Sequence, residues 1–304
     1  MTHSFTPETN LIVNNNQPIL DEENSSFKQR TPSRKYPWAI LVVVVLFVVV
    51  PFISWYGTWF GRPLSDAKMV EYLHDENKPR NVQHALSQIA NRLIDGDQSV
   101  KSFYPEVVAA SQNKQPEVRM TAAWAMGQDN TYPDFHSALL LMLQDPIAGV
   151  RHNAALGLVR FGDSSARQEL VAMLKPYAVR AEGTGTIELV VREPGVAVAA
   201  NGTLARLREA GGNTVEIHTS VAGRVESISI ANGATVEAGT ELMTLAPSTE
   251  QVWEALRALY IIGGPEDVSE IQRYARPSPT ISDRVQKQAT ATTEAIRERA
   301  GKSQ

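Results

Sequence analysis

The most conspicuous pattern along the chain is an apolar run near its N-terminal end. Residues 36–61 carry no charged side chain. As a helix, residues 38–56 would extend about 28 Å at roughly 1.5 Å per residue, close to the hydrocarbon thickness of a bilayer. Tyrosine and tryptophan lie near both ends, where membrane interfaces favour them: Tyr36, Trp38, Trp55, Tyr56 and Trp59. The pattern predicts a transmembrane helix over 36–61.

Basic residues are more numerous before this run than after it. Four precede it closely and two follow it: Lys28, Arg30, Arg34 and Lys35, then Arg62 and Lys68. The asymmetry favours a cytoplasmic N-terminus. In a bacterium the chain would then be a single-pass protein of the inner (cytoplasmic) membrane with periplasmic C-terminal domains. Residues 1–35 are polar with few large apolar side chains, which predicts a disordered cytoplasmic tail.

Apolar residues recur at helical spacing throughout 62–180. Within this region Val118-Arg119 aligns with Val150-Arg151 at an offset of 32. The pair Ala122-Ala123 aligns with Ala154-Ala155 at the same offset. A helix-pair unit that recurs at this period predicts a solenoid rather than a bundle.

The period changes near residue 181. Glycines recur from there to about 248, and Thr, Val and Ile alternate with polar residues, as in β-strands. Helical spacing then resumes, so 249–304 is expected to continue the solenoid and end in a capping helix. Trp124 and Trp253 lie on helical faces and are interpreted as core residues.

The helical region resembles HEAT repeats, including their bilin-lyase-like subset. Asp145-Pro146, Val150-Arg151 and Phe161-Gly162-Asp163 follow the family pattern. The resemblance implies that aspartate and arginine side chains bridge adjacent repeats. The candidates for such bridges, or for a surface that binds a protein partner, are Arg119, Asp145, Arg151 and Arg160.

Residues 181–248 resemble a biotinyl/lipoyl domain, or the related barrel-sandwich hybrid domain of periplasmic adaptor (membrane fusion) proteins. The stretch 223–245 has that family's order of glycines and aliphatic residues. The candidate turn residues are Gly211, Gly212, Gly223, Gly233 and Gly239. Carriers of this fold hold biotin or lipoate on a hairpin lysine, but no lysine occurs between Lys175 and Lys287. A carrier role is therefore not expected.

These patterns predict a multi-domain fold class with three parts. They are one transmembrane helix over 36–61, an all-α HEAT-type solenoid over 62–180 that resumes in 249–304, and a small all-β lipoyl-like hybrid domain over 181–248.

The amino-acid composition and the absence of known motifs exclude several kinds of functional site. The 304 residues include no cysteine, which excludes disulfides and thiolate metal sites. A formal net charge of −4 argues against a nucleic-acid partner. The six histidines do not form a ligand pair on one helix face, and neither a phosphate loop nor a nucleophile elbow occurs. No catalytic, cofactor-binding or metal-ligating residue is assigned.

The expected function is that of a non-enzymatic, membrane-anchored scaffold or assembly subunit. Its expected partners are the bilayer and other protein subunits of a membrane complex. One alternative is a periplasmic adaptor subunit of an efflux or secretion system, although the long helical hairpin of such adaptors is missing. A further alternative is a bilin-lyase-like enzyme, which pigment absorbance of the purified protein would reveal.

Overall fold

The computed structural model describes residues 63–302 together with Val42, Val44, Val45 and Phe47. Contacts along the chain divide it into two units, 1–62 and 63–304. All helices and strands described below belong to the second unit.

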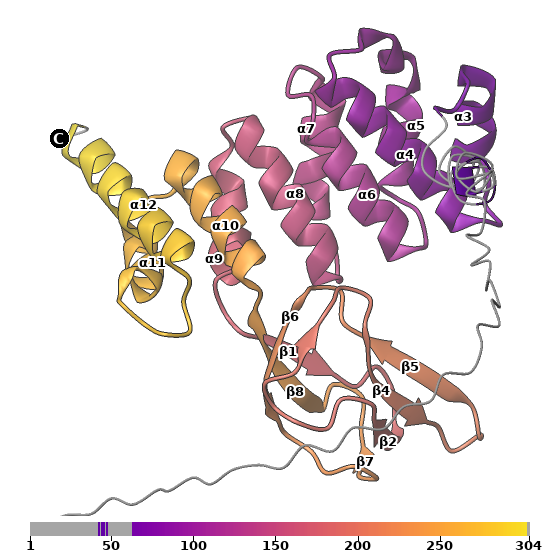
Figure 1. Ribbon diagram of the computed structural model, residues 1–304, viewed down its shortest axis with the longest axis vertical. Coiled ribbons are helices and arrows are strands. Elements are labelled where there is room, and N and C mark those ends of the chain that lie inside the picture. Colours follow the sequence, from indigo (N-terminus) through magenta and orange to yellow (C-terminus); the bar gives the residue numbers. More distant parts are fainter. Residues whose placement is uncertain (1–41, 43, 46, 48–62, 303–304) are drawn as a thin grey trace, which may run out of the picture. The chain divides into compact units, whose positions relative to one another are not determined.

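Helices of the second unit follow one another in pairs (Figure 1). We call α3, α5, α7, α9 and α11 the first helices, and α4, α6, α8, α10 and α12 the second helices. In chain order the elements are α3 (Asp66–Leu73), α4 (Pro79–Ile94), η2 (Gln98–Phe103), α5 (Tyr104–Ala110), α6 (Pro116–Met126), α7 (Pro133–Met142), α8 (Ala148–Arg160), η3 (Ser164–Ala166), α9 (Arg167–Ala172), α10 (Thr249–Ile262), η4 (Pro265–Asp267), α11 (Val268–Ala275) and α12 (Asp283–Lys302).

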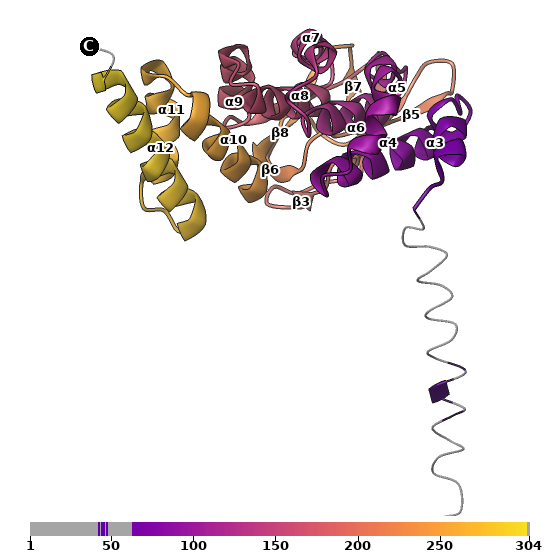
Figure 2. The same cartoon turned by 90° about the horizontal axis from the view of Figure 1, so that it is seen from above.

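The second helices pack side by side, α4 on α6, α6 on α8 and α10 on α12. Seen from above, α7, α9 and α11 lie along one side of the stack, and α10 and α12 lie along the other (Figure 2). One hydrophobic core runs through the whole row of helices. The arrangement is therefore a solenoid of stacked helix pairs.

Local sequence explains where these helices begin. Pro79, Pro116 and Pro133 occupy the first turns of α4, α6 and α7, where the missing N–H costs no hydrogen bond. Ser65 and Ser248 cap α3 and α10, and each hydroxyl oxygen accepts from a backbone N–H of the first turn.

Small residues let α6 and α8 approach closely. The alanine pairs that the sequence repeats are fully buried between them. A Cβ atom on Gly127, at the end of α6, would lie 2.9 Å from the Cα atom of Gly157 in α8. The stack has no room for a side chain at that crossing.

Residues 177–247 form a compact all-β part, which we call the β module. Its strands are β1 (Tyr177–Arg180), β2 (Gly185–Leu189), β3 (Ala197–Val198), β4 (Thr203–Arg208), β5 (Thr214–His218), β6 (Gly223–Ile228), β7 (Thr235–Val236) and β8 (Glu241–Pro247). They build two four-stranded antiparallel sheets in the orders β1-β8-β6-β3 and β5-β4-β2-β7. Aliphatic side chains from both sheets, such as Ile187, Leu204 and Leu245, form a separate core.

The β module is inserted between the two helices of one pair, α9 and α10. Its entry strand β1 and exit strand β8 are antiparallel neighbours, with Tyr177 opposite Leu245. Just outside them, the Gln251 side-chain amide donates to the Met173 carbonyl at 2.9 Å. Because the two chain crossings adjoin, α9 and α10 pack together despite the intervening module.

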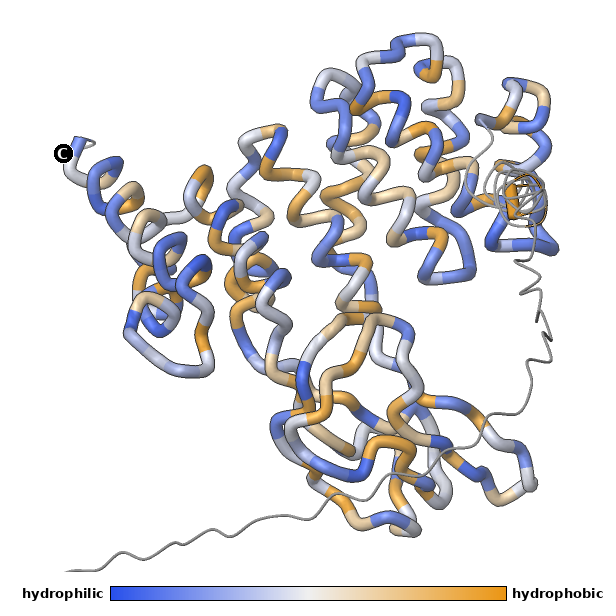
Figure 3. Tube along the Cα trace, in the orientation of Figure 1, coloured by the Kyte–Doolittle hydropathy of each residue, from blue (hydrophilic) through white to orange (hydrophobic). Residues whose placement is uncertain are grey.

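A second contact joins the β module to the stack at the start of α8. No side chain within α8 caps its first turn, and the backbone N–H of Gly149 donates to the Ser220 hydroxyl at 3.4 Å. The hydropathy-coloured trace shows the module beneath the middle of the helical row, below α8 and α10 (Figure 3). The module thus supplies a hydrogen-bond acceptor that the helix lacks.

The predicted fold class needs a correction. Within the described residues no helix is both long and apolar enough to cross a membrane. The structure consists of helices and two small antiparallel sheets, without the transmembrane helix predicted for 36–61. The single-pass inner-membrane location rested on that helix and is withdrawn with it. The prediction rested on the apolar composition of the run alone.

Several residues of that prediction lie outside the described part of the chain. Only Val42, Val44, Val45 and Phe47 of the apolar run are described. The predicted disordered tail 1–35 and the interface aromatics lie outside the described residues: Tyr36, Trp38, Trp55, Tyr56 and Trp59.

Candidate functional site

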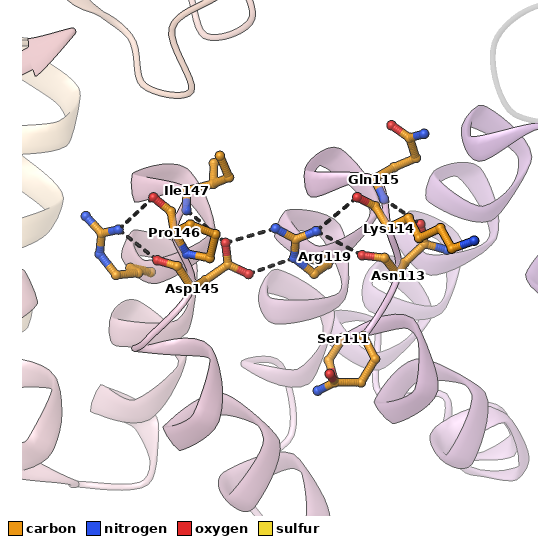
Figure 4. A network of polar contacts seen from close by, with 10 residues as sticks. Ser111, Asn113, Lys114, Gln115, Arg119, Asp145, Pro146 and Ile147 are labelled. Atoms are coloured by element: carbon orange, nitrogen blue, oxygen red, sulfur yellow. Dashed lines mark hydrogen bonds and ion pairs between the residues drawn. The ribbon is translucent and has the colours of Figure 1, made fainter. Parts of the chain in front are cut away.

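An arginine joins the second helix pair to the third. Arg119 of α6 donates to both carboxylate oxygens of Asp145, at 2.7 and 2.9 Å (Figure 4). The same guanidinium donates to the carbonyls of Asn113 and Lys114 in the turn before α6. Both side chains of the ion pair are largely buried, with 14% and 9% of their surfaces exposed. The hydrogen bonds that Arg119 donates to Asp145 raise the pKa of Arg119 further, so the guanidinium stays charged.

Arg151 of α8 repeats this arrangement one pair later. It donates to the carbonyls of Asp145 and Pro146 in its own turn. Across the junction it meets Glu169 of α9, at 3.1 Å, instead of an aspartate in the next turn. The β module occupies the place of that turn, and Glu169 supplies the carboxylate from the helix itself. His152 also reaches Glu169, at 3.3 Å.

A second series of contacts links the starts of successive first helices. The Tyr104 hydroxyl donates to Asp129 at 2.6 Å, and His136 contacts Asp163 at 2.7 Å. Arg167 continues the series with Asp267 at 2.9 Å. The sequence analysis did not find these bridges because three different residue types occupy equivalent positions. The sequence signal that could have revealed these bridges is the spacing of about one repeat between residues 104, 136 and 167.

Arg160, the remaining candidate, lies on the exposed side of α8. Its guanidinium donates to the side-chain oxygen of Gln128, just after α6, at 2.8 Å, and its carbonyl accepts from Asn130. Among the described residues no carboxylate lies within ion-pair distance of Arg160. It therefore differs from Arg119 and Arg151, which are both neutralised within the stack.

Three second helices present equivalent exposed positions. Their buried residues align as Ala122-Ala123-Met126, Ala154-Ala155-Leu158 and Ala255-Leu256-Leu259. The residues that follow on the outer side form what we call the exposed face: Trp124 of α6 and Gln128 just after it, Leu156 and Arg160 of α8, and Arg257 and Ile261 of α10. Gln128 and Leu156 are half-buried and the other four are exposed.

Apart from the neutral Gln128, the side chains of the exposed face are apolar or cationic. Trp124 and Ile261 expose 37% and 59% of their surfaces. Assignment of Trp124 to the core was therefore wrong, because its helix face carries no further layer. Arg257 stacks on Trp253, with its guanidinium carbon 4.5 Å from the ring centroid. The face thus combines branched aliphatic residues with tryptophan and arginine, the last two being residue types enriched at protein–protein contacts.

The candidate turn residues of the β module occupy two kinds of position. Gly212, Gly233 and Gly239 have φ angles of +81°, +85° and +85°, which side-chain-bearing residues rarely adopt. Gly211 lies beside Gly212 in the turn between β4 and β5, with open space around it. Gly223 instead begins strand β6, where a Cβ atom would lie 2.6 Å from the Ala246 carbonyl oxygen.

Two hollows of the described surface lie beside the ion pairs at Asp145. Grooves of about 360 and 420 Å³ flank Asp145, one beside Arg151 and Glu169 and the other beside Arg119. In the described part of the chain no three acidic or histidine side chains gather as a metal site would require.

Comparison with known proteins assigns the repeats. Residues 104–184 match the family model of HEAT repeats, which confirms the HEAT-repeat prediction for that stretch. HEAT repeats suggest a protein-interaction scaffold. No curated protein matches the chain.

One solved structure shows a local similarity. A single-chain, multi-domain long-chain acyl-CoA carboxylase is 24% identical over 33% of this chain, with a TM-score of 0.22. The match covers 10% of that protein's length, and a similarity this small supports no argument about fold or function. The biotinyl/lipoyl resemblance stays a prediction.

Proposed function

We propose that this protein is a non-enzymatic scaffold that docks another protein on the exposed face of α6, α8 and α10. The observation that carries the proposal is the exposed tryptophan, isoleucine and arginine side chains, with a half-buried leucine among them, at equivalent positions of adjacent repeats. A docking surface of this kind needs a rigid support, and the arginine bridges at the edge of the stack provide one.

The β module takes part as a second rigid body attached to the stack. Its contact at Gly149 and its two adjacent chain crossings fix where its loops lie near the second helices. A partner that occupies the exposed face has the module as a neighbour. The chain has no lysine at the β4–β5 turn, so the proposal assigns no carrier chemistry to the module.

Co-purification of tagged full-length protein from its native cells tests the proposal. We expect a stoichiometric partner whose recovery falls at least about tenfold in a Trp124→Ala, Ile261→Ser double variant. Leu141→Ser is the matched control, because Leu141 of α7 is an exposed apolar residue, at 68%, on a first helix. Equal recovery of the partner with the native protein, the double variant and Leu141→Ser would refute docking on the exposed face.

A further inference from the structure

Two arginines of the exposed face lack a carboxylate partner. Arg160 bonds the neutral side chain of Gln128, and Arg257 stacks on Trp253. Neither guanidinium lies within ion-pair distance of an acidic group in the described chain. Arginines at the repeat junctions behave differently, since Arg119, Arg151 and Arg167 each bind an aspartate or glutamate.

Apolar side chains accompany these two cations on the same three helices. Trp124 and Leu156 occupy equivalent positions on neighbouring helices, and Ile261 lies one turn beyond Arg257 on α10. No aspartate or glutamate belongs to the exposed face. The nearest carboxylate along α10 is Glu254; burial and then repulsion from Glu250 raise its pKa, and the charges of Arg257 and Arg284 oppose that shift.

We infer that the exposed face binds a protein segment in which apolar side chains are flanked by aspartate or glutamate. Carboxylates on such a segment would neutralise Arg160 and Arg257, while its apolar side chains cover Trp124, Leu156 and Ile261. The inference rests on the proposed function and adds the chemistry of the partner. Crossing three helices at spacings of about 10 Å requires a segment of about 20 Å, or about 14 helical residues.

Charge reversal on both sides of the contact tests this inference. The probe is a synthetic amphipathic peptide of about 16 residues, prepared in one form with glutamates and in another with lysines at the same positions. Binding to full-length protein is followed by fluorescence anisotropy of the labelled peptide. We expect the glutamate form to bind at least about tenfold more tightly, and its affinity to fall with added salt.

Variant proteins separate this inference from general docking. An Arg160→Glu, Arg257→Glu double variant is expected to prefer the lysine peptide, and Trp124→Ala is expected to weaken both. Arg297→Glu, at an exposed position of α12, is the matched control and should leave the preference unchanged.

The other possible results of these binding experiments distinguish the acidic partner from docking in general. Binding that depends on Trp124 but ignores peptide charge would overturn the acidic partner and leave the docking function standing. Failure of both peptides to bind, or an unchanged preference in the double arginine variant, would overturn the inference. Loss of the co-purified partner in the exposed-face variant is judged separately and concerns the proposed function alone.

Discussion

Arg119 shows how one side chain connects two repeats. Its guanidinium holds the two carbonyls of its own turn and both oxygens of Asp145. Asp145 in turn accepts from the backbone N–H of Ile147 at 2.9 Å, which fixes the start of α8. Removal of the arginine would leave a buried carboxylate with half of its partners, and burial makes that unpaired charge costly.

Arg119→Ala is therefore expected to lower the free energy of unfolding by about 3 kcal/mol. Urea denaturation followed by helical circular dichroism measures the change. Arg206→Ala is the matched control, because Arg206 and its partner Glu216 are 43% and 46% exposed and such pairs contribute about 0.5 kcal/mol. Similar losses in both variants would contradict the assignment of Arg119 as a buried bridge.

Asp129 gives the protein a specific acid sensitivity. Burial alone would raise the pKa of this carboxyl, but hydrogen bonds from Thr131 and Tyr104 and the charge of Lys101 lower it to about 2. The ordinary value in an unfolded chain is about 3.9. The unfolded chain therefore takes up a proton before the folded one as the pH falls.

The contribution of Asp129 to stability is accordingly complete above about pH 4 and is lost between pH 4 and 2. We expect its size to be about 1–2 kcal/mol. Asp129→Asn should be less stable than the native protein at pH 7 and should lose less stability on acidification across that window. Denaturation midpoints of both proteins, measured at several pH values, test this prediction. A difference between the two midpoints that stays constant from pH 4 to pH 2 would contradict it.

At the scale of elements, the start of α8 depends on the β module. Alanine normally stabilises a helix relative to glycine by up to about 1 kcal/mol. At Gly149, however, an added Cβ atom would lie 2.6 Å from the Ser220 carbonyl oxygen. A backbone atom cannot move aside without displacing its strand connection, so the steric cost exceeds the gain in helix propensity.

Gly149→Ala should thus destabilise the protein, by about 1–3 kcal/mol, although it lies in a helix. Gly301→Ala is the matched control: Gly301 is also helical, in α12, and has nothing within 4 Å of an added Cβ. Its replacement should be neutral or slightly stabilising. Thermal unfolding of the two variants compares them directly, and a stabilised Gly149→Ala would show that the module does not abut α8.

Sequence patterns predicted some contacts of these elements and missed others for physical reasons. A repeated Val-Arg and its following alanines pointed to Arg119 and Arg151, because close helix packing and the turn carbonyls demand the same residues each time. The contacts of Tyr104 and His136 were not predicted, because a hydroxyl and an imidazole can both bind an aspartate and the two positions therefore show no repeated residue type. Burial of Trp124 was wrongly inferred because helical period alone does not say how many layers cover a helix.

On the scale of the whole molecule, the β module is an insertion into a stack that can close without it. Met173 and Gln251 are hydrogen-bonded across the insertion point, and Tyr274 of α11 donates to the Leu174 carbonyl at 2.6 Å. These contacts hold α9, α10 and α11 together through residues that all lie outside the β module. The exposed face likewise contains no residue of the β module.

Replacement of 177–247 by a short glycine-containing turn is therefore expected to leave the helical stack folded. Circular dichroism should retain the helical signal, and unfolding should stay cooperative, with a loss of about 1–3 kcal/mol from the vacated contact at Gly149. An aggregated or unfolded deletion protein would contradict this view. The control is the same deletion protein carrying Gly149→Ala. This substitution should no longer destabilise it, because the deletion removes Ser220, whose carbonyl oxygen the added Cβ would otherwise contact.

The adjacency of β1 and β8 also bears on the order in which the chain acquires its structure. Before the module forms, α9 and α10 are tethered by a long flexible loop, and closing it costs about 2 kcal/mol more than closing the short turns of the other pairs. Once Tyr177 pairs with Leu245, that loop is already closed. Early folding of the module would consequently speed the completion of the fourth helix pair, and mutations that slow its strand pairing would delay assembly of the C-terminal helices without weakening them in the finished protein.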